Sequence, residues 1–300
     1  MADYIGIDVG ATFIKAGFVN PSGQVHGKVQ VPTDVGSGIP AIEARIREVF
    51  DCVAGGSPSV VCGVGLPGIV DPARGVVRSS PNIPCWHDYP ARQRIEEIVG
   101  IKVRIENDAN CAAIAEGWVG AGRGASAFLL VTLGTGVGGG IVLGGRVWHG
   151  DSGRGGEVGH IVVDPGGEPC GCGSRGCLET VASARGIQAM AASAGLRGNV
   201  EELAERARKG GRAEKEIFER AGGALGIAIA DFLNILDVHT IVVGGGAGAA
   251  LDLMQEAIRR EALRCAYALG PGALRLLGAS LGEEAGIVGA ARLAMTAGDA

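Results

Sequence analysis

Two stretches of this sequence repeat one unit, a strand, a glycine turn and a returning strand, and this repeat constrains the fold more than any other feature. The first copy turns at Gly10-Ala11-Thr12, between strands at 5–8 and 13–19, and the second turns at Gly134-Thr135-Gly136, between 128–133 and 140–143. Gly10 and Gly134 lie 124 residues apart, which is the length of an ordinary domain. The repeat therefore predicts two similar α/β domains that face each other.

Strands and helices alternate along the rest of the chain, as in α/β proteins. Apolar runs predict further strands at 24–31, 60–64, 101–105 and 240–243, and helical spacing predicts helices at 41–53, 110–119, 182–194, 200–208, 213–236, 251–266 and 283–296. We expect a smaller N-terminal α/β domain over residues 1–108 and a larger C-terminal one over 109–282. The larger domain carries a polar loop at 150–179, and the C-terminal segment 283–298 is expected to pack back onto the first domain.

Composition and charge exclude several classes of protein. Glycine makes up 54 of the 300 residues, so the chain must form many tight turns or bring its backbone close to a small ligand. The net charge of −5 argues against a nucleic-acid partner, which would need a basic surface. The uncharged stretch 125–145 is broken by glycines and predicts two strands, not a membrane span.

The N-terminus and the cysteines indicate a reduced, cytoplasmic protein. The first residues lead straight into a strand, without the basic segment of a secretion signal. Of the eight cysteines, three lie together at positions 170, 172 and 177. The other five are expected to be reduced core residues: Cys52, Cys62, Cys85, Cys111 and Cys265. This usage does not suggest a disulfide framework.

Glycine turns that follow strands are candidates for phosphate binding. They lie at Gly10–Thr12, Gly134–Gly136 and Gly244–Gly246. Without a Cβ, backbone N–H groups there can approach a phosphate closely. Any hairpin can carry a glycine, but three such turns in two similar halves favour a nucleotide over plain turns. Asp8 stands beside the first turn and either holds Mg²⁺ through water or only starts the turn.

Asn107 and Asp108 stand where a strand passes into a helix. Asp108 is expected to cap the N-terminus of that helix. A helix N-terminus also keeps a carboxylate ionised, so Asp108 can in addition accept a proton from a hydroxyl group.

The most specific signal is a metal-ligand set, His160, Cys170, Cys172 and Cys177, which spans eighteen residues. Four such ligands close a tetrahedral zinc shell, which favours a structural over a catalytic zinc. Glycines at 171, 173 and 176 allow the sharp turns that bring the sulfur atoms together. Glu157 and Glu179 lie beside two of the ligands, so the metal would hold two carboxylates near each other. Paired carboxylates suit vicinal hydroxyls, and the residues thus point to a sugar.

Seven short motifs occur along the chain: D-x-G-A-T at 8–12, L-P-G at 66–68, P-N at 81–82, E-N-D-A-N at 106–110, L-G-T-G-V-G-G-G at 133–140, E-x-G-H at 157–160 and C-x-C-G-x-x-G-C-x-E at 170–179. In this set and order the chain resembles the ROK family of repressors, open reading frames and sugar kinases. Within that family it is most similar to the bacterial glucokinase group.

The resemblance implies the actin-like ATPase (ribonuclease H-like) fold, two similar α/β domains with a cleft between them. It also implies transfer of the γ-phosphate of ATP to the 6-hydroxyl of glucose, with Asp108 as general base. The implied sugar ligands are Gly68, Asn82, Asn107, Asp108, Glu157, His160 and Glu179. The implied ATP ligands are Gly10, Thr12, Gly134, Thr135 and Gly136 for the phosphates, Gly244, Gly245 and Gly246 for the adenosine, and Asp8 for Mg²⁺. The family further implies a homodimer or a tetramer.

Two departures from the family pattern concern ATP binding. The family usually has D-x-G-G-T-K where this chain has Ala11 and Phe13. If the second glycine needs a positive φ, Ala11 is strained there and the phosphate contact is weaker. The family also often has Asn-Pro where this chain has Asp237-Val238-His239, near the expected adenine side.

Several alternative functions stay open from the sequence. The sugar can be N-acetylmannosamine or N-acetylglucosamine, the phosphate donor can be polyphosphate, and the protein can be a sugar sensor without activity. A sugar-sensing repressor is the alternative from another class. It would need a DNA-binding segment before the first strand, and here the first strand begins at Tyr4.

Overall fold

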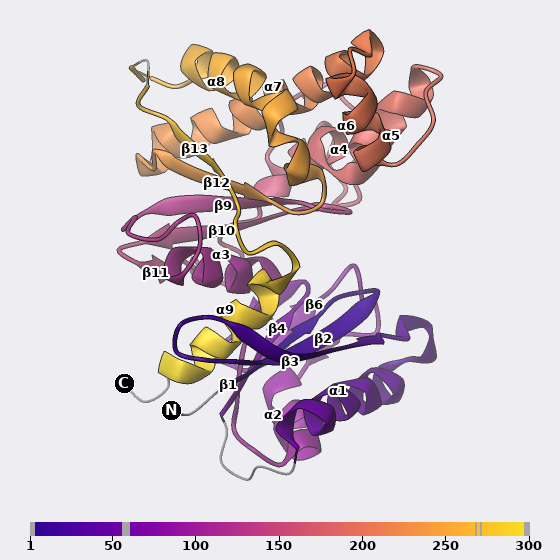
Figure 1. Cartoon of the computed structure of the whole chain (residues 1–300), viewed down its shortest axis with the longest axis vertical. Coiled ribbons are helices and arrows are strands. Elements are labelled where there is room, and N and C mark those ends of the chain that lie inside the picture. The colour runs from indigo at the N-terminus through magenta and orange to yellow at the C-terminus, as the bar shows by residue number, and fades with distance from the viewer. Residues whose placement is uncertain (1–3, 56–60, 268, 271, 297–300) are drawn as a thin grey trace. The chain divides into compact units, whose positions relative to one another are not determined.

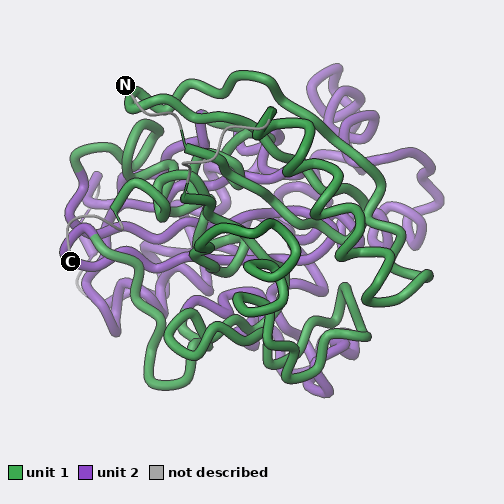
Figure 2. The backbone as a smooth tube through the Cα atoms, turned by 90° about the horizontal axis from the view of Figure 1, so that it is seen from below, with its two compact units in different colours: residues 1–124, 146–155, 281–300 green, residues 125–145, 156–280 purple. Residues whose placement is uncertain are grey.

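The computed structural model describes residues 4–55, 61–267, 269–270 and 272–296, and the chain divides into two compact units (Figure 1, Figure 2). The first unit comprises residues 1–124, 146–155 and 281–300, and the second comprises 125–145 and 156–280. This division differs from the boundary expected after residue 108, because residues 109–124 belong to the first unit. Figure 2 draws the two late segments, 146–155 and 281–296, in the colour of the first unit.

The first unit contains most of the elements from the N-terminal half of the chain. They are β1 (Tyr4–Val9), β2 (Phe13–Val19), β3 (Val25–Pro32), a 3₁₀ turn (Val35–Ser37), α1 (Ile39–Ala54), β4 (Cys62–Leu66), β5 (Ile69–Asp71), β6 (Val76–Ser79), β7 (His87–Tyr89), α2 (Ala91–Val99), β8 (Val103–Asn107), α3 (Asp108–Trp118), β11 (Arg146–Val147), a second 3₁₀ turn (Gly282–Glu284) and α9 (Ala285–Met295).

The main sheet of the first unit has the strand order β3-β2-β1-β4-β8. β1 pairs antiparallel with β2 and parallel with β4, and β8 continues parallel on β4. Helices α1 and α2 lie on one side of this sheet and α9 on the other (Figure 1), so β4 is buried at all five positions. Asp8, Gly65 and Glu106 stand in register where β1, β4 and β8 end. The parallel strands thus bring distant polar residues to one edge.

The contact of α9 with the sheet is a contact between backbones. A Cβ on Gly6 of β1 or on Gly63 of β4 would overlap a carbonyl group of α9. On the opposite side, a Cβ on Gly289 of α9 would overlap the carbonyl group of Cys111 in α3. Glycine is needed at these positions because a larger residue would force the helix away from the strands. This close packing explains part of the high glycine content of the chain.

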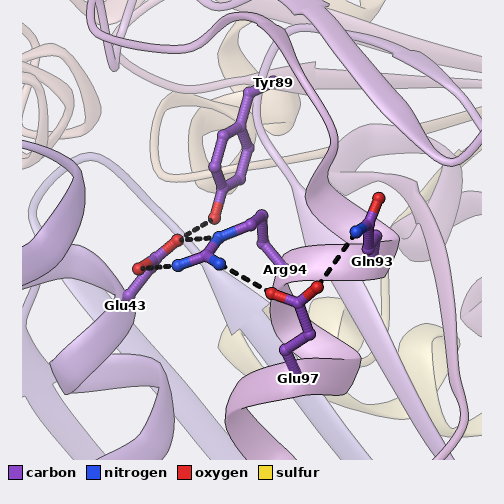
Figure 3. Close-up of polar contacts among 5 residues, drawn as sticks. All are labelled: Glu43, Tyr89, Gln93, Arg94 and Glu97. Carbon is purple, nitrogen blue, oxygen red and sulfur yellow. Dashed lines mark hydrogen bonds and ion pairs between the residues drawn. The ribbon is translucent and has the colours of Figure 1, made fainter.

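A polar cluster joins α1 to α2 in the first unit (Figure 3). Arg94 donates two hydrogen bonds of 3.0 Å to the two carboxylate oxygens of Glu43, and the Tyr89 hydroxyl donates a third of 2.8 Å. Arg94 also reaches Glu97 at 2.6 Å, and Gln93 donates to Glu97. Burial alone would raise the pKa of Glu43, but the bonds from Arg94 and Tyr89 outweigh it and lower the pKa.

The second unit contains β9 (Phe128–Leu133), β10 (Val137–Leu143), a 3₁₀ turn (Val158–His160), α4 (Leu178–Ala182), α5 (Ala184–Ser193), α6 (Val200–Arg208), α7 (Arg212–Leu236), β12 (Thr240–Gly244), a 3₁₀ turn (Ala247–Ala250), α8 (Leu251–Cys265) and β13 (Arg275–Gly278). β9 pairs antiparallel with β10 and parallel with β12, and β13 continues parallel on β12. This is the arrangement of β2-β1-β4-β8 in the first unit. The predicted repeat of one α/β unit is therefore confirmed.

Most predicted elements are present, with shifted ends. The helix at 200–208 has the predicted bounds, and a capping box of Asn199 and Glu202 fixes its start. The helix predicted over 182–194 is present as α5 (Ala184–Ser193), and it begins two residues later because Ser183 caps it by accepting a hydrogen bond from the Gly186 N–H. The sequence analysis missed β5, β6, β7, α2, α4 and β13. Of the predicted segment 283–298, α9 covers 285–295, and residues 297 and 298 lie outside the described residues.

No helix in the described part of the chain combines the length and the apolar character that a membrane span requires.

We expect Gly63→Ala to destabilise the protein by more than about 4 kcal/mol or to prevent folding, because the methyl group would overlap a carbonyl oxygen that has no room to move. Gly36→Ala is the matched control, since a Cβ there meets nothing within 4 Å, and it should change the free energy of unfolding by less than about 0.5 kcal/mol. Urea denaturation measures both. A Gly63→Ala variant as stable as the wild type would contradict the close packing of α9.

Glu43→Gln should lower the free energy of unfolding by about 1–2 kcal/mol at pH 7, because it replaces the ion pair with Arg94 by a neutral contact. Since folding lowers the pKa of Glu43, its contribution is present above the unfolded value of about 4.3 and is lost as the pH falls through the folded value. The difference between wild type and variant should therefore shrink on acidification. Glu97→Gln, at an exposed position, should have a smaller effect, and a pH-independent difference would refute the assignment.

Candidate active site and metal centre

The residue that caps α3 is Asn107. Its side-chain oxygen accepts a hydrogen bond of 3.0 Å from the Asn110 N–H, and Asp108 is the first residue of the helix. The prediction that Asp108 is the cap was therefore wrong by one residue. The Asn107 side-chain oxygen is therefore engaged in capping the helix. Asp108 stands in the first turn, where the helix dipole favours a negative charge.

Two donors hold the Asp108 carboxyl group. Its Oδ1 accepts hydrogen bonds of 2.9 Å from the Ala109 N–H and 3.0 Å from the Asn107 side-chain amide. The same amide also donates to the carbonyl oxygen of Gly68 at 3.0 Å. Asn107 thus fixes Asp108 and ties the loop after β4 to the start of α3.

In the first unit, Gly68 in the loop after β4 lies against Ser79 and Ser80, and Asn82 follows Ser80 by two residues. Gly68 has a φ of 101°, and a Cβ there would overlap the carbonyl oxygen of Ser79. Ser80 accepts hydrogen bonds from the Ile83 N–H through its carbonyl and hydroxyl oxygens, which closes a turn that presents Asn82 on the surface. Gly68 therefore shapes the loop through its backbone, and Asn82 offers an exposed amide.

The first glycine turn is exposed at Ala11 and Thr12, and hydrogen bonds from Thr33 hold its backbone. Thr33 is fully buried, its hydroxyl donates to the Gly10 carbonyl oxygen at 2.6 Å, and its N–H donates to the Thr12 carbonyl oxygen at 3.0 Å. Ala11 is not among the residues with positive φ, so it is not strained. The departure from the family's second glycine has no backbone cost here.

Asp8 lies at the end of β1 in a desolvated position. Burial raises the pKa of Asp8 to about 6, although Lys15 on the neighbouring strand opposes the shift. A Cβ on Gly286, at the start of α9, would overlap the Asp8 carboxyl group. An oxygen ligand at this edge fits a hard divalent cation such as Mg²⁺.

Asp8, Glu106 and Asp108 converge on one buried thiol. Cys111 is fully buried, and burial together with the negative charges of these three residues raises the pKa of its thiol well above the usual value. The structure therefore brings together acidic groups at the ends of β1 and β8, which lie about a hundred residues apart in the sequence.

In the second unit, the second glycine turn lies against Glu179 and against the third glycine turn. A Cβ on Gly136 would overlap the Glu179 carboxylate, which also accepts a hydrogen bond of 3.0 Å from the Val137 N–H. Gly245 has a φ of 81°, and a Cβ there would overlap the backbone of Leu133. The unit thus brings together Glu179, Gly134–Gly136 and Gly244–Gly246.

The predicted metal ligands form one cluster. His160, Cys170, Cys172 and Cys177 each offer a ligand atom, and these atoms lie within 4.8 Å of one another. The sulfur atoms of Cys172 and Cys177 are 3.7 Å apart, and so are the Cys170 sulfur and His160 Nδ1. Four ligands around zinc, with Zn–S bonds of about 2.3 Å, require edges of about 3.8 Å between sulfur atoms. The cluster fits a closed tetrahedral zinc shell.

The ring of His160 links the metal cluster to Glu157. Nδ1 faces the Cys170 sulfur, while Nε2 lies 4.0 Å from Glu157 Oε2. A metal on Nδ1 would leave the Nε2–H directed at a carboxylate, a common way in which proteins orient a ligating histidine.

A cavity of about 880 Å³ opens in the second unit beside these residues. Thr135, Glu179 and Cys170 line one part of it, and Ser183, Arg185 and Arg220 line another. The third glycine turn, which the resemblance assigns to adenosine, is not among the lining residues.

The remaining cysteines only partly match the expectation of a core location. Cys62 and Cys111 are buried, but Cys52 and Cys85 are exposed and Cys265 is half-buried. The prediction was wrong for these three because apolar neighbours in the sequence alternate between the buried and exposed sides of a helix or turn.

The sequence analysis missed an ion pair beside Asp108, between Glu106 and His149. The distance from His149 Nε2 to Glu106 Oε2 is 2.7 Å, and the Glu106 side chain is 4% exposed. Glu106 is the first residue of the E-N-D-A-N motif, but nothing in the sequence signals a partner 43 residues away.

Comparison with known proteins identifies the family. The sequence profile of the ROK family matches residues 4–297. The chain belongs to the ROK family. A glucokinase of Halalkalibacterium halodurans is 38% identical to this ROK protein over 309 residues, which cover 95% of this chain and 93% of that one.

Two solved ROK structures share the fold. A ROK hexokinase from Thermus thermophilus is 36% identical, with a TM-score of 0.84 and 100% of both chains covered. A ROK family glucokinase from Streptomyces griseus, solved in complex with glucose and AMPPNP, is 33% identical, with a TM-score of 0.83 and coverage of 98% of this chain and 100% of that one. These neighbours have the actin-like ATPase fold, which confirms the expected fold class.

Cys172→Ala should lower the zinc content of the purified ROK protein from about one to well below one per chain, because it opens the closed ligand shell. Without the metal, the loop should become cleavable by trypsin at Arg154 or Arg175. Cys85→Ala, an exposed cysteine outside the cluster, is the control and should bind zinc like the wild type. Full zinc content in Cys172→Ala would rule out this ligand set.

Proposed function

We propose that this protein is an ATP-dependent glucokinase that transfers the γ-phosphate of ATP to the 6-hydroxyl of glucose. The 38% identical glucokinase, aligned over 95% of this chain, supports the choice of reaction. The observation that carries the proposal is the position of Asp108 in the first turn of α3, held by Asn107 and the Ala109 N–H.

Asp108 acts as the general base in this proposal. Two N–H donors to Oδ1 and the helix N-terminus favour its charged form and fix the orientation of the carboxyl group. As the glucose 6-oxygen bonds to the γ-phosphorus and the bond from phosphorus to ADP breaks, the hydroxyl proton passes to Asp108. Most of the catalytic effect then comes from positioning and from charge stabilisation.

We assign the sugar hydroxyls to the residues that the family resemblance implies. These are the amides of Asn82 and Asn107, the backbone of Gly68, the carboxylates of Glu157 and Glu179, and the Nε2–H of His160. Zinc is structural in this proposal, and it orients His160 and thereby Glu157.

The nucleotide is held by backbone groups. In this proposal Gly10, Thr12, Gly134, Thr135 and Gly136 offer N–H groups to the phosphates, and Gly244–Gly246 bind the adenosine. Asp8 would hold Mg²⁺, which supplies charge neutralisation at the phosphates when it is bound. A homodimer in the cytoplasm completes the proposal, and eight free cysteines fit a reducing compartment.

Asp108→Asn should lower kcat by about 100-fold or more while the Kd for glucose changes only a few-fold, because the amide keeps the size of the side chain but takes up no proton. Coupled detection of ADP gives kcat, and calorimetry gives the Kd. Asp51→Asn, an exposed position on α1, is the control. A variant that keeps most of the wild-type kcat would exclude Asp108 as the base.

The same assay decides the substrate. Glucose, mannose, N-acetylglucosamine and N-acetylmannosamine should be compared with ATP and with polyphosphate as donors. Turnover with glucose and ATP supports the proposal, whereas preference for an N-acetyl sugar keeps the residue roles and changes the substrate. Sugar binding without turnover would instead identify a sensor.

A further inference from the structure

The ion pair between Glu106 and His149 has no role in the reaction as described above. Glu106 is the last residue but one of β8, directly before Asn107 and Asp108. His149 belongs to the segment 146–155, which connects two stretches of the second unit but is itself part of the first unit. The His149 ring donates from Nε2 to Glu106 Oε2 at 2.7 Å.

In the described part of the chain, the Glu106 carboxylate accepts hydrogen bonds from the start of α3 and from the segment that carries His149. Oε1 accepts from the Asn107 N–H at 2.9 Å and from the Asn110 side-chain amide at 3.0 Å, and Oε2 takes the bond from His149. Asn110 is 4% exposed, and its amide must keep this orientation, because the reverse one would set oxygen against oxygen. Glu106 therefore holds a residue on each side of Asp108, Asn107 directly before it and Asn110 two positions after it.

A buried carboxylate needs a cation or it becomes neutral. In the described part of the chain no lysine or arginine forms a hydrogen bond with Glu106, so His149 is its positive partner. A neutral histidine would leave an uncompensated charge inside the protein, which is costly. The burial of Glu106 thus calls for a protonated ring at His149.

The path from His149 to Asp108 is short. His149 binds Glu106, Glu106 binds the Asn107 backbone, and the Asn107 side chain donates to Asp108 Oδ1 at 3.0 Å. The segment that carries His149 is also closed on itself, because the Gly155 N–H donates to the His149 carbonyl oxygen at 2.8 Å. Glu157 follows Gly155 by two residues, so this hydrogen bond fixes the backbone two residues before Glu157.

We infer that His149 is a positioning residue for phosphoryl transfer: its protonated ring neutralises Glu106 and so holds the Asn107–Asp108 turn and the segment 146–155 in one arrangement. This inference rests on the proposed kinase function. His149 touches neither sugar nor nucleotide in this account, and it acts only through Glu106 and Asn107.

The charged surroundings set the direction of the pH dependence. Glu106 is the charged group that acts on the His149 ring and raises its pKa, against the effect of burial. Asp8 and Asp108 act with Glu106 on the neighbouring Cys111 thiol, and all three add negative charge to this region. Asp151 and Arg154 share the His149 segment but form no hydrogen bond with the ring in the described part of the chain. The pair is therefore intact below the ordinary histidine pKa of about 6.5 and is lost as the pH rises through the raised value.

The test compares pH profiles of kcat for wild type, His149→Gln and the double variant Glu106→Gln/His149→Gln. We expect His149→Gln to lower kcat about 10-fold at pH 7 and to leave the KM values within about 2-fold of the wild type. The variant should also lack the loss of activity that the wild type shows at alkaline pH. The double variant removes the buried charge together with its partner, so its kcat should return to within about 3-fold of the wild type without the alkaline loss. His87→Gln is the control and should match the wild type, because the His87 side chain is 82% exposed.

Two outcomes overturn the inference while the kinase function stands. One is an active wild type whose kcat and alkaline profile are unchanged by His149→Gln. The other is a double variant that remains as impaired as His149→Gln. If the wild type phosphorylates no sugar, the proposed function fails, and the role in phosphoryl transfer fails with it. The pairing is then still decided by NMR, since Glu106→Gln should return the His149 pKa to the ordinary range, and an unchanged pKa would refute the pairing.

Discussion

The close approach of α9 to the strands beneath it is the constraint on which the rest of the first unit depends. Gly6 and Gly63 let the helix backbone lie on β1 and β4, and Gly289 lets it lie on α3. Helix α9, near the end of the chain, thereby completes the unit that contains β1, the first strand. Because Gly286 of the same helix lies against Asp8, this packing also sets the position of a candidate cation ligand.

Helix α3 also anchors the connecting segments of the first unit. Buried glutamates near its two ends form hydrogen bonds with the residues at which the chain leaves or re-enters this unit. Glu106 precedes the helix and binds His149 of the segment 146–155. Glu116, which is fully buried, accepts the Ala121 N–H at 2.6 Å and the Leu281 N–H at 2.9 Å. The helix that presents Asp108 thus also fixes the connections at 121–124, 146–155 and 281. Any movement of these connections would act on the element that carries the proposed base.

The sequence was sufficient where the chemistry is local. The metal ligands lie within eighteen residues, so their spacing alone predicted a cluster that the structure contains. The repeated strand–turn–strand unit was equally clear, since alternating burial and glycine turns are properties of neighbouring residues. The family resemblance supplied the order of the motifs, and the match to the ROK profile over residues 4–297 confirms it.

What the sequence did not predict depends on contacts between distant residues or on competition between neighbours. Glu179 reaches Val137 across 42 residues, and Glu106 reaches His149 across 43. Asn107 and Asp108 are both good capping residues, and only the backbone geometry at the end of β8 decided for Asn107. The break between α4 and α5 at Ser183 has the same cause, because a serine inside an apolar run fits a helix interior as well as a cap.

Three carboxylates in one small region repel one another, and the first unit accommodates each by a different means. Asp108 stands at a helix N-terminus with two N–H donors, Glu106 is paired with a histidine, and Asp8 has a pKa raised to about 6 by burial. The Cys111 thiol among them stays neutral, since the same charges raise its pKa. Burial thus disfavours the charge of Asp8, and the opposing effect of Lys15 does not outweigh it. A divalent cation that arrives with a nucleotide would compensate that charge, so the same desolvation that makes Asp8 costly in the free protein would strengthen its attraction for the cation.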